Sequence, residues 1–244
     1  MWQQEIWDAE TARRYDTPGR GMFAPQVLAA TVDRLAGLAG AGAALEFAVG
    51  TGRVAVPLAE RGVPFTGIEL SEPMIDQLRG KADADTIPVI VGDMAEASAP
   101  GRYSLVYLVY NTISNLLDQD AQIACFHNAA RHLVPGGRFV IELGVPELRK
   151  LPPGQDAVVF TNEPGYLGVD TYDPLRQHLI SHHVEFTESR QARLSRCQQR
   201  YIWPAELDLM ARLAGFELEA RHADWSGAEF TAESPAHVSV YRLP

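Results

Sequence analysis

The sequence has little basic charge for its length of 244 residues. Its 21 lysine and arginine residues stand against 31 aspartate and glutamate residues, which gives a formal net charge of −10. A protein that binds a phosphate backbone needs a positively charged face, and the few basic residues here are interleaved with polar or acidic ones. We therefore expect no nucleic-acid partner.

Cysteines and long apolar runs are also scarce. Cys125 and Cys197 are the only cysteines, so neither a disulfide framework nor a zinc site with CxxC spacing is expected. No apolar run approaches the roughly 20 residues of a membrane-spanning helix. The start of the chain, Met1–Glu5, lacks the basic and apolar regions of a signal peptide. With 46% apolar and 21% charged residues, the composition predicts a globular cytoplasmic protein without a membrane partner.

Short apolar runs alternate with amphipathic segments through the first half of the chain. The predicted strands are 43–48, 64–70, 87–91, 103–109 and 138–143, and the predicted helices between them are 53–61, 71–81 and 119–133. Strands joined by helical crossovers form a parallel sheet that is covered on both faces, which is an α/β fold. Pro57 lies more than a turn inside the first of these helices, so that helix either kinks or begins later.

The two ends of the chain follow other patterns. A helix is predicted over 24–38, and prolines and glycines break 146–200 into short strand-like pieces such as 177–186. We interpret 146–200 as an insertion of antiparallel strands and not as a second domain. A helix over 204–214 and strands over 216–221 and 236–242 are expected to close the fold.

This pattern predicts a single domain over 1–244. Its parts are N-terminal cap helices (1–38), a ligand-binding core (40–145), inserted strands that cover a substrate (146–200), and a closing helix and strands (201–244). The inserted strands could pair across a twofold axis, so the sequence leaves a monomer and a homodimer both open.

The segment Leu45–Ala55 contains the sharpest motif, in which a strand ends, Gly50 and Gly52 turn the chain, and a helix begins. Glycines allow the backbone to approach a ligand closely, and unpaired N–H groups at the start of a helix then face that ligand. Alternatively, the turn needs glycine for its own geometry.

Two acidic residues follow the next predicted strands. Glu69 ends the second strand and Asp93 follows the third, so both lie at the edge of the sheet where the glycine turn is expected. A carboxylate at the first position can accept both hydroxyls of a ribose, and one at the second can bind an adenine amino group. Either residue alone could instead be a helix cap or a turn residue. Together they favour a nucleoside site.

Glu46 distinguishes between two classes of nucleoside ligand. It lies four residues before Gly50, where a negative charge would repel a pyrophosphate. The same charge would attract a ligand that carries a protonated amine and a sulfonium. This favours S-adenosylmethionine over NAD.

These residues resemble a known family. The order Glu46-x-Ala48-x-Gly50-x-Gly52, Glu69, Gly92-Asp93, Tyr103–Asn111 and Leu133–Gly137 is similar to that of the class I S-adenosylmethionine-dependent methyltransferases, in particular the small-molecule enzymes of actinobacterial metabolism. The resemblance covers about residues 40–145 strongly and extends more loosely through Trp7–Asp16 and Tyr201–Pro204. It implies a Rossmann-like, doubly wound sheet of seven strands, mostly parallel with an antiparallel last strand. Ala48 stands where the family has its first loop glycine, which leaves the loop less free.

The resemblance also implies contacts with the methionine part of the cofactor. Glu46 would bind the amine, and the loop beneath the methionine would consist of Ala48, Gly50, Thr51 and Gly52. Tyr15 would approach the methionine carboxylate, although it could equally be a packing residue of the first helix.

Contacts with the rest of the cofactor follow in the same way. Glu69 would hold the ribose, and Leu70 and Met74 would line the adenine side. Asp93 and Met94 would contact the adenine itself. The sulfonium would be bordered by the residues that end the fourth strand, namely Val109, Tyr110 and Asn111.

The acceptor is less defined by the sequence. Because the methyl donor is already activated, positioning in a dry site supplies most of the catalysis, and only an oxygen acceptor needs a general base. No such base is identified. Strand alternation places His178 and His182 on one face and His183 on the other, which favours surface histidines over metal ligands. The segment Tyr110–Ile113 also lacks the Asp/Asn-Pro-Pro-aromatic tetrad of nucleic-acid amino-methyltransferases, so a small-molecule acceptor is expected.

Two other functions remain open at this point. Gly50-x-Gly52-x-x-Ala55 satisfies a loose dinucleotide-binding fingerprint, so an NAD(P)-dependent oxidoreductase is one alternative. The other is a protein that binds or cyclises S-adenosylmethionine without transferring its methyl group.

Overall fold

The computed structural model describes residues 6–186 and 191–244. The predicted segments 1–38 and 146–200 are described only in part, because Met1–Glu5 and residues 187–190 lie outside these ranges. Within the described ranges, no helix has the length and apolar character that a membrane crossing requires.

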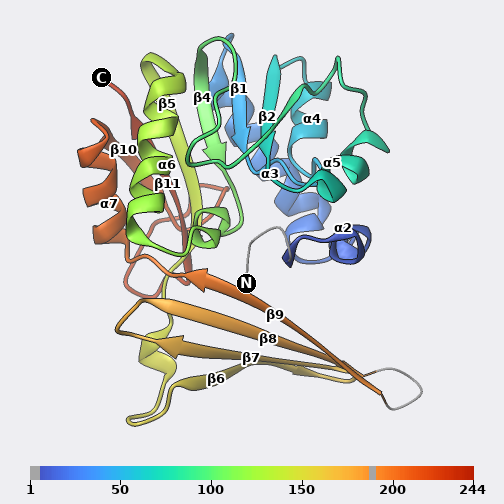
Figure 1. Ribbon diagram of the computed structural model, residues 1–244. Helices are drawn as coiled ribbons and strands as arrows, with labels where there is room; N and C mark the ends of the chain where they lie inside the picture. Colours follow the sequence, from blue (N-terminus) through green and yellow to red (C-terminus); the bar gives the residue numbers. More distant parts are fainter. Residues whose placement is uncertain (1–5, 187–190) are drawn as a thin grey trace.

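Seven strands form the larger sheet (Figure 1). In chain order they are β1 (Ala44–Phe47), β2 (Phe65–Glu69), β3 (Val89–Val91), β4 (Tyr103–Leu108), β5 (Leu133–Gly144), β10 (Glu217–His222) and β11 (Ala236–Arg242). Their order across the sheet is β10-β11-β5-β4-β1-β2-β3. β1 to β5 are parallel, whereas β11 is antiparallel to both of its neighbours. The predicted seven-stranded sheet with an antiparallel last strand is confirmed.

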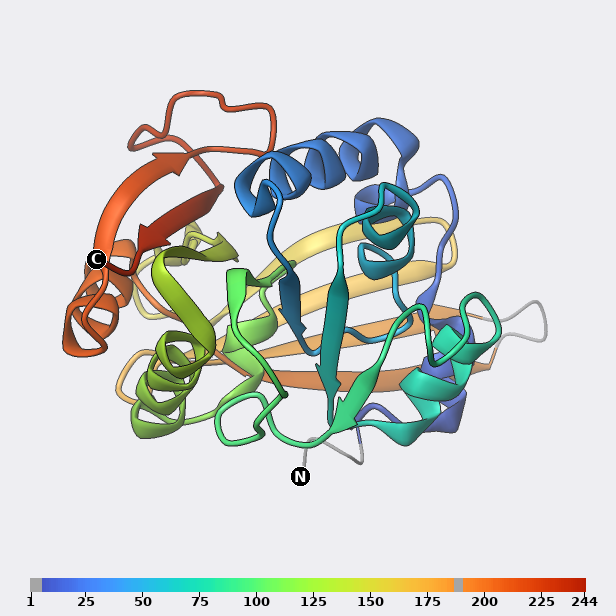
Figure 2. The same cartoon turned by 90° about the horizontal axis from the view of Figure 1, so that it is seen from above.

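Helices cover both faces of this sheet (Figure 2). The α-helices are α2 (Ala9–Tyr15), α3 (Pro25–Ala39), α4 (Ala55–Glu60), α5 (Glu72–Arg79), α6 (Gln119–His132) and α7 (Pro204–Leu213). Short 3-10 turns are η1 (Gly21–Phe23), η2 (Thr112–Asn115) and η3 (Leu148–Lys150). Buried residues of α3 and α4 pack in one core cluster, and those of α6 and α7 pack in the other. The doubly wound arrangement is therefore confirmed.

Three local predictions need correction. α4 begins at Ala55, so Pro57 lies in its first turn, where the missing N–H has no helical partner to lose. Residues 92–102, between β3 and β4, contain no helix, although a helical crossover was expected there. β5 begins at Leu133 and not at Arg138.

The early start of β5 has a structural cause. Gly136 has a φ of 79°, and its N–H donates to the Leu243 carbonyl at 2.7 Å. The Leu243 N–H donates in turn to the Gly137 carbonyl at 2.9 Å. The C-terminal residues thus pair with the Pro-Gly-Gly stretch, and a register shift against β4 accommodates Pro135.

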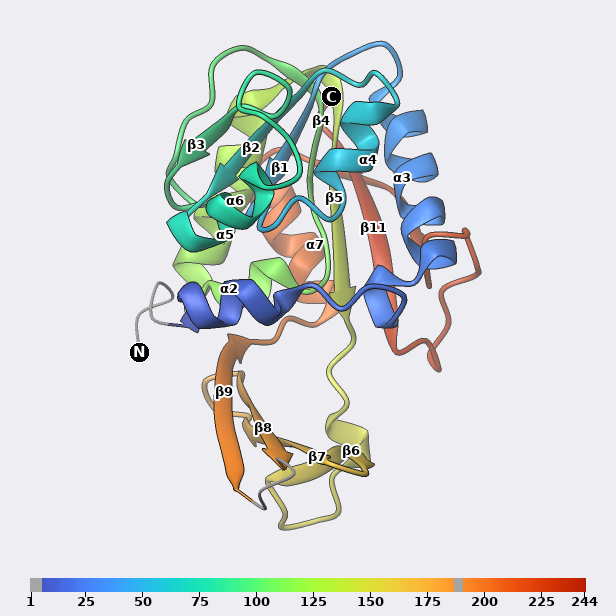
Figure 3. The ribbon, with the colours of Figure 1, turned by 90° about the vertical axis from the view of Figure 1, so that its right-hand side faces the viewer.

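Four further strands form a separate antiparallel sheet, which we call the inserted sheet. It consists of β6 (Ala157–Glu163), β7 (Tyr166–Asp173), β8 (His178–Phe186) and β9 (Ala192–Arg200), in that order. This confirms the predicted insertion of antiparallel strands. Figure 3 shows the inserted sheet beyond the end of β5, with α2 lying between it and the α/β core.

Polar contacts hold the inserted sheet in place at its two ends. Where β9 ends, the buried Arg200 guanidinium donates to Gln122 on α6 at 2.5 Å and to Glu206 on α7 at 2.7 Å. At the other end, Arg14 of α2 pairs with Glu185 of β8 at 2.6 Å. The inserted sheet therefore has a defined position over the carboxyl ends of the parallel strands.

Candidate active site

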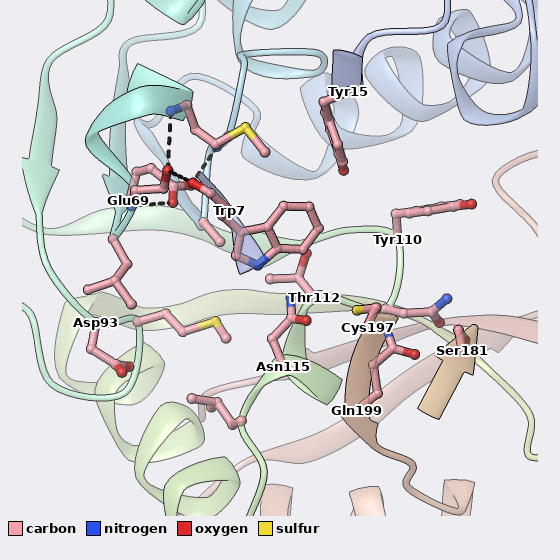
Figure 4. Close-up of a pocket in the computed structure, with 18 of the residues that line it drawn as sticks. Trp7, Tyr15, Glu69, Asp93, Tyr110, Thr112, Asn115, Ser181, Cys197 and Gln199 are labelled. Atoms are coloured by element: carbon pink, nitrogen blue, oxygen red, sulfur yellow. Dashed lines mark hydrogen bonds between the residues drawn. The ribbon is translucent and has the colours of Figure 1, made fainter. Parts of the chain in front are cut away.

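A cavity of about 420 Å³ lies between the carboxyl ends of the parallel strands and the inserted sheet. Its volume is in the range of sites that enclose a small molecule. The wall has three parts: the residues that follow β1 to β4, the N-terminal segment, and one face of the inserted sheet. Figure 4 shows side chains from all three parts directed toward the same space.

The two loop glycines have different roles. Gly50, with a φ of 57°, lines the cavity, and a Cβ added to it would meet no atom nearer than the Ala48 carbonyl oxygen at 3.9 Å. A Cβ on Gly52 would meet Leu78 Cδ1 at 2.3 Å, so glycine there permits close packing of α5. The ligand interpretation therefore fits Gly50, and the packing interpretation fits Gly52.

Glu69 ends β2 with its carboxylate in the cavity wall and is 6% exposed. One carboxylate oxygen accepts the Gly50 N–H and the other accepts the Ser71 N–H, each at 2.8 Å. Burial raises the pKa of Glu69, and these two hydrogen bonds oppose that rise. Since each carboxylate oxygen has a second lone pair, Glu69 can accept two further hydrogen bonds.

Asp93 lies beyond the end of β3 and also lines the cavity. Its Oδ1 accepts the Ala95 N–H at 2.7 Å, which fixes the orientation of the carboxylate. Leu70, Met74 and Met94 supply the apolar wall around these two acids. A few polar groups on an apolar wall are the usual arrangement of a site that binds and orients a small molecule.

Backbone strain marks the end of β4. Tyr110 and Asn111 have consecutive left-handed conformations, with φ values of 51° and 62°. Glu142 of β5 accepts the Tyr110 N–H at 2.8 Å, and the Asn111 side chain accepts the Gly144 N–H at 2.6 Å. These bonds stabilise a backbone that non-glycine residues rarely adopt, and both Tyr110 and Asn111 line the cavity.

Tyr15, at the end of α2, is both a packing residue and a wall residue. Its ring meets those of Trp7 and Phe23 edge-on at 5.6 and 6.1 Å, and burial raises its pKa to about 12. Tyr15 and Trp7 both line the cavity, and the Trp7 carbonyl accepts a hydrogen bond from the Ser71 hydroxyl at 2.6 Å. Trp7 was not among the predicted site residues, although the family resemblance extends loosely through the segment that contains it.

Four of the predicted cofactor contacts lie behind the wall instead of on it: Glu46, Thr51, Gly52 and Val109. Glu46 is 2% exposed and accepts a hydrogen bond from the Tyr107 phenol at 2.9 Å, and burial raises its pKa to about 8. The Thr51 hydroxyl donates to Asp16 at 2.6 Å. Direct contact of these four residues with a cofactor stays a prediction.

The inserted sheet contributes wall residues that the sequence analysis did not identify. They are Phe160, Asp170, Leu179, Ser181, His183, Cys197 and Gln199. Strand alternation separates His183 from His178 and His182, as predicted, but only the strand register shows which face meets the cavity.

Comparison with known proteins agrees with this geometry. Residues 44–137 match the family model of a methyltransferase domain. The solved structure of the CcbJ methyltransferase from Streptomyces caelestis is 39% identical, with 98% of each chain covered and a TM-score of 0.87. The chain belongs to the class I S-adenosylmethionine-dependent methyltransferases.

Two more distant relatives of this methyltransferase are informative. A cypemycin N-terminal methyltransferase from a Streptomyces species is 27% identical over 202 residues, which are 78% of each chain. The S-adenosylmethionine-bound structure of CalS10, an amino pentose methyltransferase from Micromonospora echinaspora, has a TM-score of 0.70. It is 18% identical over 100% of this chain and 98% of the other, so it shows the shared fold.

The cavity of the methyltransferase fits its cofactor. The open face of Gly50, the spare lone pairs of Glu69 and the carboxylate of Asp93 lie along one wall. Among the described residues, no lysine or arginine lines the cavity, which suits a cofactor with a net positive charge. The comparisons favour methyl transfer over the oxidoreductase and cyclase alternatives.

Proposed function

We propose that this methyltransferase methylates a small molecule that binds between the cofactor and the inserted sheet. One observation carries the proposal: the same cavity is walled on one side by residues at the ends of the parallel strands and on the other by β7, β8 and β9. The similar proteins include enzymes named for an amino pentose and for a glycopeptide, which supports a metabolite acceptor.

The proposed cofactor contacts follow the wall residues. Glu69 binds the ribose hydroxyls, and Asp93 binds the adenine amino group. Leu70, Met74 and Met94 pack around the adenine. Ala48 and Gly50 lie beneath the methionine, and the sulfonium end is bordered by Tyr15, Tyr110 and Asn111.

S-adenosylmethionine supplies an electrophilic methyl group on a positively charged sulfur. The protein holds the two reactants in line and limits water in a site lined by Trp7 and the inserted sheet. Most of the rate enhancement then comes from positioning.

The test combines binding with product detection. Calorimetry is expected to show binding of S-adenosylhomocysteine and no comparable binding of NADH. Incubation with methyl-labelled cofactor and a fractionated metabolite extract is expected to give one labelled small product by mass spectrometry. No labelled small product, or label found only in a rearranged cofactor, would contradict the proposed function.

A further inference from the structure

The wall of the cavity opposite the cofactor residues carries one carboxylate, that of Asp170 on β7. We propose that Asp170 binds the acceptor as a cationic amine and accepts the proton that the amine must lose before methylation. This inference rests on the proposed function, because it assigns the acceptor half of the same cavity.

Strand register places Asp170 in that wall. Asp170 is paired with Ser181 on β8, which is paired with Cys197 on β9, and all three residues line the cavity. The Ser181 hydroxyl donates to Asp170 Oδ1 at 2.7 Å. Figure 4 shows Ser181 and Cys197 beside the space that Tyr110 borders. Asp170 is thus oriented by its neighbour on the face that meets the acceptor.

The second carboxylate oxygen is available to a ligand. Within the described ranges, Ser181 is the one side chain that donates to Asp170, and Asp170 forms no ion pair. A partly buried carboxylate that lacks a cationic partner is costly, and a ligand cation would remove that cost.

Charges around Asp170 select the kind of acceptor. Among the titratable groups near its carboxylate, His182 and His183 of β8 stabilise the charge and Glu147 opposes it. Tyr166, Tyr172 and Cys197 also interact with it. With no lysine or arginine among the described wall residues, an acceptor that carries a carboxylate or phosphate would be repelled. An ammonium group is the complementary partner.

With Asp170 as the proton acceptor, the protons and electron pairs of the methyl transfer are all accounted for. The bound ammonium gives one proton to the Asp170 carboxylate and becomes a neutral amine with a free lone pair. The nitrogen forms a bond to the methyl carbon while the carbon–sulfur bond breaks, and its electron pair stays on sulfur. The products are a methylated ammonium and the neutral thioether, and Asp170 then releases its proton to solvent. Burial raises the pKa of Asp170, which makes it a better proton acceptor than an exposed aspartate.

Sinefungin provides a probe that does not require the acceptor to be known. It is an analogue of S-adenosylhomocysteine with an amine-bearing carbon in place of sulfur, so its extra ammonium lies near the position of the methyl group. Calorimetry should show that Asp170→Asn weakens sinefungin binding at least about fivefold and S-adenosylhomocysteine binding less than about twofold. Equal losses for both ligands, or no loss for either, would overturn the role of Asp170.

Two further variants control for folding. Asp156→Asn alters an exposed aspartate next to β6, outside this cavity, and is expected to change neither affinity. Ser181→Ala keeps the charge but removes its orienting hydrogen bond, so it should weaken sinefungin binding in the same direction by a smaller factor. If the unmodified protein bound neither ligand, the proposed function itself would fail. If the unmodified protein bound both ligands and Asp170→Asn left the ratio of the two affinities unchanged, only the role of Asp170 would be refuted.

Discussion

Glu69→Gln tests the cofactor wall most directly, because both oxygens of this buried carboxylate accept a backbone N–H. A glutamine offers one oxygen and one NH2 group, so the N–H of either Gly50 or Ser71 would face another donor. An unsatisfied buried donor costs about 1–3 kcal/mol. Removal of the buried charge offsets part of this cost, so we expect the free energy of unfolding to fall by about 1–2 kcal/mol.

The effect on ligand binding is separate from the effect on stability. A carboxylate can accept from both ribose hydroxyls, whereas the glutamine loses one of these bonds to a charged acceptor, worth about 1.5–3 kcal/mol. Since about 1.4 kcal/mol is a factor of ten, S-adenosylhomocysteine should bind roughly 10- to 150-fold more weakly.

Urea unfolding and isothermal calorimetry measure the two quantities on the same preparations. Glu72→Gln is the matched control, because Glu72 is exposed in the first turn of α5, three positions along the chain. It should change either free energy by no more than about 0.5 kcal/mol. An unchanged affinity in Glu69→Gln, with the variant folded, would refute the assignment of Glu69 to the ribose.

Three further perturbations have defined outcomes. The pKa of Glu46 is about 8 in the folded protein against an ordinary value of 4.5, so unfolding releases its proton and stability should fall as pH rises between these values. Urea unfolding should show that Glu46→Gln flattens this slope, and an identical slope in the variant would contradict the raised pKa. Asn111→Gly keeps the left-handed backbone but loses the bond to the Gly144 N–H, so stability should fall by about 1 kcal/mol, with a larger relative loss in kcat than in S-adenosylhomocysteine affinity. The Lys81 ammonium donates hydrogen bonds to Asp16 and to the Thr51 carbonyl, and so links the N-terminal segment to the glycine turn. Stopped-flow measurements should show that Lys81→Ala speeds S-adenosylhomocysteine release. An unchanged rate would show that this link does not restrain the site.

The cofactor wall was predictable because its residues obey a local rule. Gly50, Glu69 and Asp93 each lie at or just beyond the end of a strand of one parallel sheet, and the carboxyl ends of such strands meet at one edge. Strand type and order can be read from apolar runs, so these three residues could be brought together without coordinates. Residue type alone could not show that Gly52 accommodates Leu78 while Gly50 faces the cavity, since both occupy the same turn.

Departures from the predicted fold occur where long-range contacts override a local signal. Pro135 and the two glycines after it read as a helix stop followed by a loop. Pairing with Leu243, at the far end of the chain, extends β5 through them instead. Glu46 was predicted to bind the cofactor amine, and that contact stays a prediction; no local pattern indicated that the Tyr107 phenol would donate a hydrogen bond to its carboxylate in the core. In both cases the deciding partner lies more than sixty positions away, beyond the reach of a local pattern.

The acceptor wall was inaccessible to sequence reasoning for a related reason. Which residues of β7 face the cavity depends on its register with β6 and β8, and a slip by one residue would replace Asp170 with Val169 or Thr171. The register against β6 shifts between Val159 and Thr161, and the intervening Phe160 ring lies over Gly168. A Cβ on Gly168 would meet that ring at 2.3 Å, so this glycine is what allows Phe160 to reach the cavity. Family membership therefore predicts the cofactor half of the site, whereas the acceptor half depends on a bulge and a glycine that have no recognisable motif.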